Sequence, residues 1–228
     1  MTSQFVKFSF FKFTTQWHAI DEGERQVARK DFETTVNSWT AGEGRILRPY
    51  TLTGIRPDAD LMLWQVAPCL EDHHELGRSL RKSLAGQFYE EPHGYLAITK
   101  RSVYVDRHRH EGQEGSRLEV VPGKGKYLFV YPFVKTRSWY RLPAEERQRA
   151  MDEHIRIGHK YPGVRINTTY SFGLDDQEFV VAFEGDDPVE FVDLVMELRG
   201  SEASAYTERD TPIFTGISVS LSEALDAI

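Results

Sequence analysis

The spacing of apolar residues predicts a strand-rich first half with two helices. Residues 5–13 form a dense aromatic run with Lys7 and Lys12 interleaved, which is typical of a strand that faces a core. Residues 21–40 are mostly polar, and their few large apolar positions recur every three to five residues, which favours an amphipathic helix. The predicted elements of this half are strands at 5–13, 45–54, 60–67 and 94–104 and helices at 21–40 and 70–84.

The second half repeats this order of periods. Strands are predicted at 126–133, 164–172, 178–184 and 211–219, and helices at 143–160 and 187–198. A turn-rich segment separates the two central strands of each set, at 54–60 in the first half and at 173–176 in the second, with an offset of about 119 residues. We interpret the repeat as a duplicated strand-helix-strand-strand-helix-strand unit, the ferredoxin-like motif.

The duplication predicts an α+β fold, in which two ferredoxin-like units form a dimeric α+β barrel. Each sheet is expected to carry its helices on one face and to bury its other face against the second sheet. We expect a ligand pocket in the cavity between the two sheets. The predicted boundaries are an N-terminal half at 1–105, a connecting loop at 106–125 and a C-terminal half at 126–228. The loop is rich in charge and glycine, which indicates a linker or, alternatively, a lid over the pocket.

Charge and cysteine content narrow the classes of partner. The net charge of −7 over 228 residues disfavours nucleic acids and anionic membranes, which need a basic surface. The single cysteine, Cys69, excludes an internal disulfide framework and a cysteine-rich zinc site. The first residues lack the charged and apolar regions of an export signal, and no apolar run approaches eighteen residues. We therefore expect a cytoplasmic protein with a small-molecule partner.

Three side chains in the second half suggest chemistry. His154 lies on the predicted helix 143–160, and one axial histidine is all that a haem iron needs, although a lone helical histidine is more often structural. Tyr131 and Lys135 lie four residues apart at the end of a strand, where a phenol and an ammonium could supply an electron and a proton to an oxidising centre. The same spacing is equally typical of a core tyrosine followed by a solvated lysine, so it does not decide between these interpretations.

Other polar groups support weaker hypotheses. Arginine side chains suit carboxylates, so Arg117 and Arg199, together with the hydroxyl of Ser204, are candidate donors to an acidic ligand. The histidines at 73–74 and at 108 and 110 have no carboxylates arranged around them for a metal ion, and we interpret them as exposed. The glycines around Lys124 lack the frame of a phosphate-binding loop, and no Gly-x-Ser-x-Gly elbow is present for a serine hydrolase.

Longer motifs in the second half resemble a known family. They are Tyr-Pro-Phe-Val-Lys-Thr-Arg-Ser-Trp-Tyr-Arg-Leu-Pro at 131–143, Glu-Glu-Arg at 145–147, Met151, His154, Val-Arg-Ile-Asn-Thr at 164–168, Gly-Leu-Asp-Asp-Gln-Glu-Phe at 173–179 and Glu-Leu-Arg at 197–199. Together they resemble the chlorite dismutase superfamily, and most closely its coproheme decarboxylase branch. The resemblance covers the second half closely, and the first half through its architecture and Asp-Leu-Met-Leu-Trp at 60–64.

The resemblance implies a homopentamer in which each C-terminal half binds a porphyrin. His154 matches the proximal iron ligand, Tyr131 the tyrosine that becomes a radical and attacks a propionate, and Lys135 the neighbouring proton donor. The donors implied to hold the propionates are Arg117, Arg199 and Ser204. The implied reaction uses two hydrogen peroxide molecules to convert two propionates of iron coproporphyrin III (coproheme) to vinyl groups. It yields haem b, so coproheme is both substrate and redox cofactor, and a ferrochelatase is the candidate donor of that substrate.

The residue over the open face of the iron differs among branches of this family. Chlorite dismutases proper carry an arginine there, and the matching position in this chain is Asn167, or Ile166 if a connection shorter by one residue shifts the register. Arg165 shares a strand face with Asn167 and keeps chlorite degradation as the first alternative function. A second branch uses an upstream histidine, for which His108 and His110 are the candidates. A haem-binding protein without turnover is the alternative from another functional class.

Overall fold

The computed structural model describes residues 3–102, 104 and 119–228. In the first half a short helix α1 (Thr15–Ala19) follows the first strand, and a turn of 3-10 helix, η1 (Leu84–Gln87), precedes the last. The main elements are β1 (Phe5–Phe13), α2 (Glu22–Thr40), β2 (Ile46–Thr51), β3 (Leu61–Ala67), α3 (Leu70–Lys82) and β4 (Tyr89–Ile98). This order is the one predicted from the apolar periods.

The second half repeats the order with several short additions. Its main elements are β5 (Tyr127–Lys135), α5 (Ala144–Gly158), β6 (Arg165–Tyr170), β7 (Phe179–Gly185), α6 (Pro188–Arg199) and β9 (Phe214–Ser218). The additions are α4 (Arg137–Arg141), η3 (Glu202–Tyr206), β8 (Thr207–Arg209) and α7 (Leu221–Asp226). These segments are too short to show a clear apolar period, which is why the sequence did not predict them.

Two of the main helices, α2 and α6, begin at residues whose side chains accept a hydrogen bond from a free backbone amide. Asp21 accepts a hydrogen bond from the backbone N–H of Glu24 at 3.0 Å at the start of α2. Asp187 caps α6 in the same way at 2.8 Å, and Pro188 follows as the first helical residue, where no amide donor is needed. These caps set the point at which each chain segment turns from the sheet onto its outer face.

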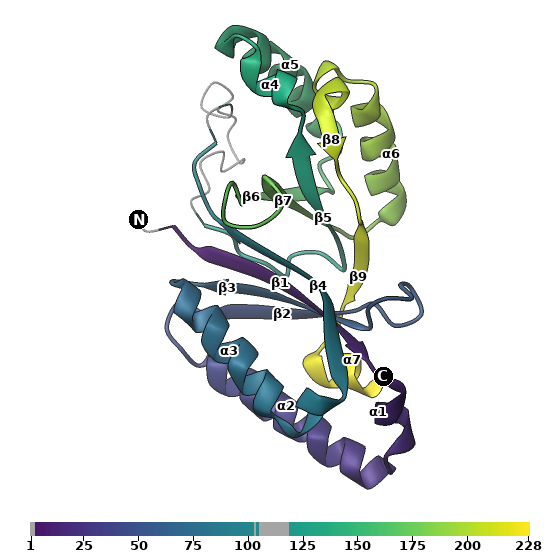
Figure 1. Ribbon diagram of the computed structural model, residues 1–228. Helices are drawn as coiled ribbons and strands as arrows, with labels where there is room; N and C mark the ends of the chain where they lie inside the picture. The colour runs from purple at the N-terminus through teal and green to yellow at the C-terminus, as the bar shows by residue number, and fades with distance from the viewer. Residues whose placement is uncertain (1–2, 103, 105–118) are drawn as a thin grey trace.

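The strands form one closed antiparallel ring. Within the first half the order is β4-β1-β3-β2, and within the second it is β9-β5-β7-β6, which is the ferredoxin-like order in both. The two sheets are joined where β2 pairs with β9 and where Ile98 of β4 pairs with Tyr170 of β6. The α+β class is therefore confirmed, and the sheets meet along their edges as well as across their faces (Figure 1).

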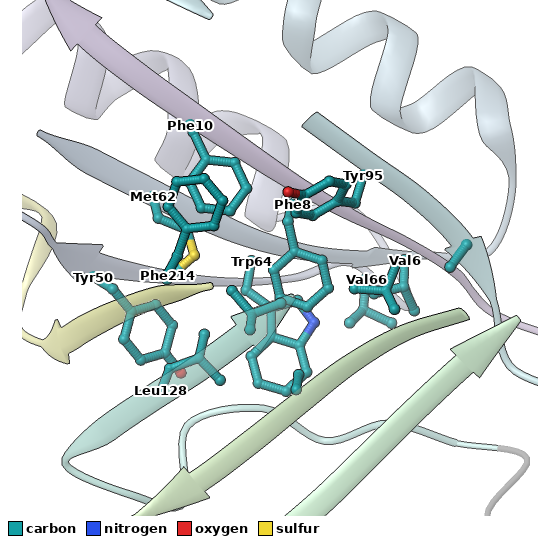
Figure 2. Packing of buried hydrophobic residues seen from close by; sticks show 14 of the residues in the cluster. Val6, Phe8, Phe10, Tyr50, Met62, Trp64, Val66, Tyr95, Leu128 and Phe214 are labelled. Atoms are coloured by element: carbon teal, nitrogen blue, oxygen red, sulfur yellow. The ribbon is translucent and has the colours of Figure 1, made fainter. Parts of the chain in front are cut away.

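The interior of the ring is packed with apolar side chains from both halves. Phe8 stacks on Trp64 with ring centroids 5.2 Å apart, and Phe10 meets Phe214 at 4.1 Å. Leu128 and Tyr50 reach the same cluster from opposite halves (Figure 2). The prediction of a ligand pocket between the sheets is therefore wrong for the described residues, because large aromatic side chains fill that space.

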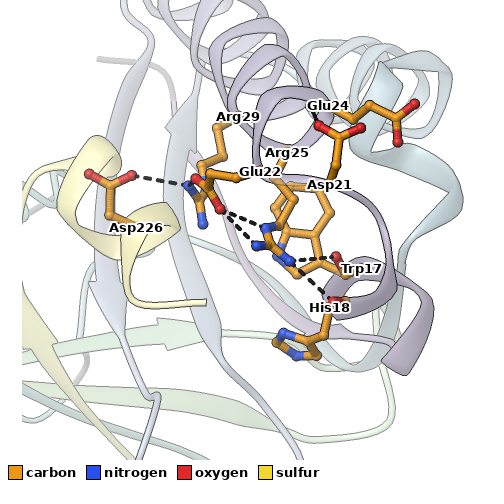
Figure 3. Close-up of polar contacts among 8 residues, drawn as sticks. All are labelled: Trp17, His18, Asp21, Glu22, Glu24, Arg25, Arg29 and Asp226. Atoms are coloured by element: carbon orange, nitrogen blue, oxygen red, sulfur yellow. Dashed lines mark hydrogen bonds and ion pairs between the residues drawn. The ribbon is translucent and has the colours of Figure 1, made fainter.

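Helices cover the outer face of each half (Figure 1). On the first half, α2 and α3 enclose an aromatic layer that includes Phe11, Phe13 and Phe32. The C-terminal helix α7 also packs on this half, and Arg29 of α2 lies 3.7 Å from the carboxylate of Asp226 (Figure 3). On the second half, α5 and α6 cover a separate apolar layer.

Strand β4 lies earlier in the chain than the predicted 94–104, since it spans Tyr89–Ile98. Pro92 and Gly94 lie inside it, and both residues argue against a strand interior. They are tolerated because β4 pairs along its length with β1 only, and its other side pairs solely at Ile98 among the described residues. A proline whose missing amide points away from the neighbouring strand costs no ladder hydrogen bond.

Candidate functional site

Strand β5 directs its alternate residues to the two sides of the second sheet. Leu128 and Val130 point into the ring interior, whereas Phe129, Tyr131 and Phe133 join the apolar layer beneath α5 and α6. Tyr131 is largely covered there and stacks against Phe183, with ring centroids 6.0 Å apart. The candidate residues therefore lie between the sheet and its helices, outside the ring.

Lys135 is buried at the end of β5 and does not reach solvent as a typical strand-end lysine would. Its ammonium donates a hydrogen bond to the carbonyl oxygen of Ala203 at 2.6 Å and lies 4.5 Å from the ring centroid of Trp139. Burial lowers the pKa of Lys135 to about 8, and the carboxylate of Glu178 opposes that shift. The interpretation of Lys135 as a solvated charge is therefore wrong.

Glu178 is a buried carboxylate that fixes the end of β5. It accepts hydrogen bonds from the backbone N–H of Lys135 at 2.8 Å and from the hydroxyl of Tyr140 at 2.5 Å, and Arg137 lies 3.6 Å away. Burial and that hydrogen bond raise the pKa of Tyr140. The motif 173–179 contains Glu178, but nothing in its spacing marked that residue as the partner of the strand carrying Tyr131.

His154 lies on α5 between the buried residues Ala150 and Ile157, which share its face of the helix by their spacing of four and three residues. Burial lowers the pKa of His154 to about 4, and the positive charge of Lys135 lowers it further while Glu153 opposes the shift. The imidazole is therefore neutral at neutral pH, which is the form that ligates a metal ion.

Tyr131 is influenced by an ion pair at the other end of the layer. Arg199, the last residue of α6, pairs with Asp210 at 2.5 Å between guanidinium nitrogen and carboxylate oxygen. Burial raises the pKa of Tyr131, Asp210 raises it further, and Arg199 opposes the shift. The phenol thus keeps its proton well above neutral pH. Asp210 was not predicted as part of the site, because it follows the short strand β8 and belongs to no periodic segment.

The outer face of β6 remains partly open beside Tyr131. Across the three strands Thr168 pairs with Val181, which pairs with Tyr131, so these residues form one row on the helix-facing side. Ile166 lies on the same face and is 50% exposed, as is Phe172 just beyond the strand. Exposed apolar groups next to a partly buried phenol give this half a surface suited to a flat apolar ligand.

Asn167 lies on the opposite face of β6 from Tyr131, at odds with its prediction as a cofactor contact. It is buried, and its side-chain amide donates to Glu184 at 3.3 Å on the ring side of the sheet. The alternation of strand residues explains this placement, since Asn167 neighbours Ala182 rather than Val181. Arg165 lies two residues before Asn167 and therefore on the same face of β6, and its guanidinium group donates a hydrogen bond to the carbonyl oxygen of Lys124 at 3.2 Å. Ile166 is the residue of this segment that faces the layer.

The remaining predicted residues have different outcomes. Ser204 lies in η3, directly after Ala203, whose carbonyl oxygen accepts the hydrogen bond of Lys135. Arg117, His108 and His110 lie outside the described residues. The described part of the chain holds no cluster of three or more histidine, cysteine or carboxylate side chains that could bind a metal ion together. Within it, no helix has both the length and the apolar content to cross a bilayer.

His73 is a second buried histidine, and its prediction as an exposed residue is wrong. It shares a face of α3 with Leu76 and Leu80, and its Nδ1 atom lies 3.2 Å from the amide oxygen of Gln65. Burial lowers the pKa of His73 to about 4. This histidine belongs to the closed layer of the first half, away from Tyr131.

Comparison with known proteins identifies the family of this chain. The family model described as chlorite dismutase matches residues 14–219. The chain belongs to the chlorite dismutase family. A curated relative named coproheme decarboxylase, from Mycolicibacterium smegmatis (strain ATCC 700084 / mc(2)155), is 33% identical over 229 residues, covering 98% of this chain and 94% of the relative. The resemblance predicted from the motifs is thus confirmed.

Solved members of the family share the fold at lower sequence identity. A variant of chlorite dismutase from Candidatus Nitrospira defluvii matches with a TM-score of 0.89 at 23% identity, covering 98% of this chain and 94% of that one. A complex of the same enzyme with imidazole matches with a TM-score of 0.88 at 23% identity and the same coverage. At this level of identity the likeness establishes the architecture of the family and not the substrate.

Proposed function

We propose that this protein is a coproheme decarboxylase, which uses hydrogen peroxide to convert coproheme to haem b. The observation that carries the proposal is the placement of Tyr131, a partly buried phenol that keeps its proton, in the layer beneath α5, with His154 on the face of α5 that also carries the buried Ala150 and Ile157. The named activity of the 33% identical relative supports the same reaction. Chlorite dismutases proper tend to lack a tyrosine at this position, as the motif resemblance implies.

The residues of the second half suit an iron porphyrin. A neutral imidazole is available at His154, apolar side chains are exposed at Ile166 and Phe172, and a cationic group is present at Arg199. An iron porphyrin supplies a flat apolar ring, an open coordination position and anionic propionates, which match these groups. When bound, the iron would supply the oxidising chemistry with peroxide.

Each proposed residue has one task. His154 would hold the iron from the helix side, and Arg199 with Ser204 and Arg117 would hold propionates. Tyr131 would orient one propionate by its hydroxyl, give up the hydrogen atom of that hydroxyl to the oxidant, and take one in return from the propionate side chain. Lys135 would hold a proton at its ammonium group near the same end of the layer, where its lowered pKa of about 8 makes proton release easier than for an ordinary lysine.

The overall chemistry balances with peroxide as the only oxidant. Each propionic acid side chain loses one carbon dioxide and two hydrogen atoms to become a vinyl group. The two hydrogen atoms and their electrons reduce one hydrogen peroxide molecule to two water molecules. Two such rounds convert coproheme to haem b, so the protein must present two different propionates to Tyr131 in turn.

Chlorite degradation is the alternative, and the placement of β6 side chains disfavours it. Arg165 and Asn167 belong to the ring side, and Ile166 is the residue of that segment facing the layer. An arginine over the iron would have to come from another segment of the chain. The test is direct: haem-loaded protein that evolves oxygen from chlorite at a sustained rate would overturn the proposal in favour of this alternative.

Mass spectrometry of the bound pigment tests the decarboxylase directly. Coproheme-loaded protein is treated with increasing hydrogen peroxide, and the pigment is extracted and weighed. We expect a first species that has lost one carbon dioxide molecule and two hydrogen atoms. A second species should follow that has lost two carbon dioxide molecules and four hydrogen atoms. A protein that only carries haem would bleach its pigment without producing either species, and that result would refute the proposed reaction.

We further propose a cytoplasmic homopentamer that receives coproheme from a ferrochelatase. The motif resemblance is the support for the assembly and for the donor. Analytical ultracentrifugation of the coproheme-loaded protein measures the number of subunits in the assembly. The rate at which coproheme moves from ferrochelatase to this protein tests the donor. A monomer in solution, or transfer no faster than spontaneous release, would contradict the corresponding proposal.

A further inference from the structure

The guanidinium group of Arg199 already has a carboxylate partner within the chain. Arg199 ends α6, and its terminal nitrogen lies 2.5 Å from Asp210, which follows β8. The arginine side chain is 52% exposed, whereas that of Asp210 is 18% exposed. The cation thus remains open to an incoming ligand on one side while its internal partner is mostly covered.

This ion pair adjoins the proposed reacting phenol. Arg209 pairs with Val134 and Phe214 pairs with Val130, so the segment that contains Asp210 runs alongside the part of β5 that contains Tyr131. A carboxylate brought to Tyr131 therefore comes near both charges of the ion pair. Asp210 repels that carboxylate and competes with it for the same donors. The ion pair with Asp210 takes up a terminal nitrogen of the guanidinium group and offsets its charge, which weakens the attraction of Arg199 for a second carboxylate.

We propose that Asp210 is an internal competitor that occupies Arg199 whenever no porphyrin carboxylate does, and that it lowers the affinity of this corner for propionates. This inference rests on the proposed function. When a propionate becomes a vinyl group, the ligand no longer has a carboxylate at Arg199, and the ion pair between Arg199 and Asp210 forms again. Asp210 would thereby help the reacted side of the porphyrin to leave Arg199. The second round of the reaction requires this step, because a different propionate must then reach Tyr131.

A purely structural role for Asp210 predicts the opposite effect of substitution. In that case the ion pair ties the end of α6 to the segment after β8, and removing it would loosen the site and weaken ligand binding. In the competitor account, Asp210→Asn frees Arg199 and removes a negative charge, so porphyrin binding tightens. The sign of the change in affinity therefore separates the two accounts.

The experiment measures binding of ferric coproporphyrin III without peroxide, by Soret absorbance and quenching of tryptophan fluorescence. The variants are Asp210→Asn, Arg199→Gln, the double variant, and Asp226→Asn as a control with the same change in net charge on the other half. We expect Asp210→Asn to lower the dissociation constant about three- to tenfold at low salt, with a smaller gain at high salt. The gain should be clearly smaller in the Arg199→Gln background, where only the direct repulsion by Asp210 is relieved, and Asp226→Asn should leave the dissociation constant within about twofold.

Each outcome bears on a specific claim. Unchanged or weaker binding by Asp210→Asn overturns the competitor role, and a lowered melting temperature in the same variant would assign the ion pair to structure. If the wild type binds coproheme and Asp210→Asn tightens it but peroxide yields no decarboxylated pigment, the competitor role survives and the proposed reaction fails. A wild-type protein that binds no coproheme overturns both.

Discussion

The two halves of the molecule use one framework for different purposes. In the first half, Asp60 accepts a hydrogen bond from the backbone N–H of Phe13 at 2.8 Å, and its own N–H donates to the carbonyl oxygen of Phe11. In the second half, Glu178 accepts from the backbone N–H of Lys135 at 2.8 Å, and its own N–H donates to the carbonyl oxygen of Phe133. The carboxylates of Asp60 and Glu178 therefore occupy equivalent positions in the two halves. Their hydrogen bonds show that Phe13 of the first half corresponds to Lys135 of the second.

The same sequence offset aligns the chemistry of one half with the core of the other. Tyr131 corresponds to Ser9, which hydrogen-bonds to Gln65 at 3.0 Å, and His154 corresponds to Phe32, which is fully buried among aromatic rings. At two of these three aligned positions, Phe13 and Phe32, the first half has a large apolar side chain where the second half has a group that titrates. Among the described residues, the second half leaves a large apolar side chain, Ile166, exposed on the adjoining strand, and no strand of the first half does so. The duplicated unit thus keeps one copy closed for stability and one open for a ligand.

Replacing Tyr131 by phenylalanine should give the largest effect. Tyr131→Phe removes the hydroxyl and keeps the ring, so we expect decarboxylation to slow by roughly 100-fold or more while coproheme affinity changes little. Tyr95→Phe is a matched control, because its buried hydroxyl has no partner among the described residues and lies in the ring interior. Single-turnover kinetics measures both variants. Equal rates for Tyr131→Phe and wild type would remove the phenol from the mechanism.

Removing the imidazole tests which half binds the iron. We expect His154→Ala to weaken coproheme binding at least about tenfold and to change the Soret spectrum, because the iron loses its protein ligand. His73→Ala should leave both properties unchanged, since its imidazole is part of a closed layer. Optical titration provides the measurement. A normal spectrum in His154→Ala would place the iron elsewhere.

The sequence predicted the duplicated unit well because apolar periods are properties of whole segments. It placed the chemical residues less well, since their roles depend on pairings between segments. The family resemblance matches Asn167, or alternatively Ile166, to the residue over the iron. Strand alternation places the side chain of Asn167 on the ring side and that of Ile166 on the helix side. Glu178 and Asp210 carry no distinguishing spacing, and the structure alone reveals that they contact Lys135 and Arg199.

Exposed apolar residues of the second half should contribute to ligand affinity rather than to folding. Ile166→Ser is expected to cost about 1 kcal/mol of coproheme binding, or about fivefold in dissociation constant, because less apolar area is covered by the ring. The free energy of unfolding should change by less than about 0.5 kcal/mol, since the side chain is half exposed. Val27→Ser, on an exposed position of α2, is the control expected to alter neither quantity.

The buried histidine of the first half should make stability depend on pH. The pKa of His73 is about 4 in the folded state, whereas an unperturbed histidine, as in the unfolded state, has a pKa of 6.5. The unfolded state therefore takes up the proton first as the pH falls. Stability is therefore lost between pH 6.5 and 4, with a slope of at most about 1.4 kcal/mol per pH unit, and the loss levels off below pH 4. His73→Gln should reduce this slope in urea unfolding of the ligand-free protein. The remaining slope is expected to include His154, whose pKa is also about 4.

The position of the porphyrin is the central claim, and a crystal structure of the coproheme complex tests it most directly. We predict iron bound to the imidazole of His154, the ring against the face that carries Ile166, and one propionate at the hydroxyl of Tyr131. A porphyrin bound inside the strand ring, or on the helix layer of the first half, would contradict the account.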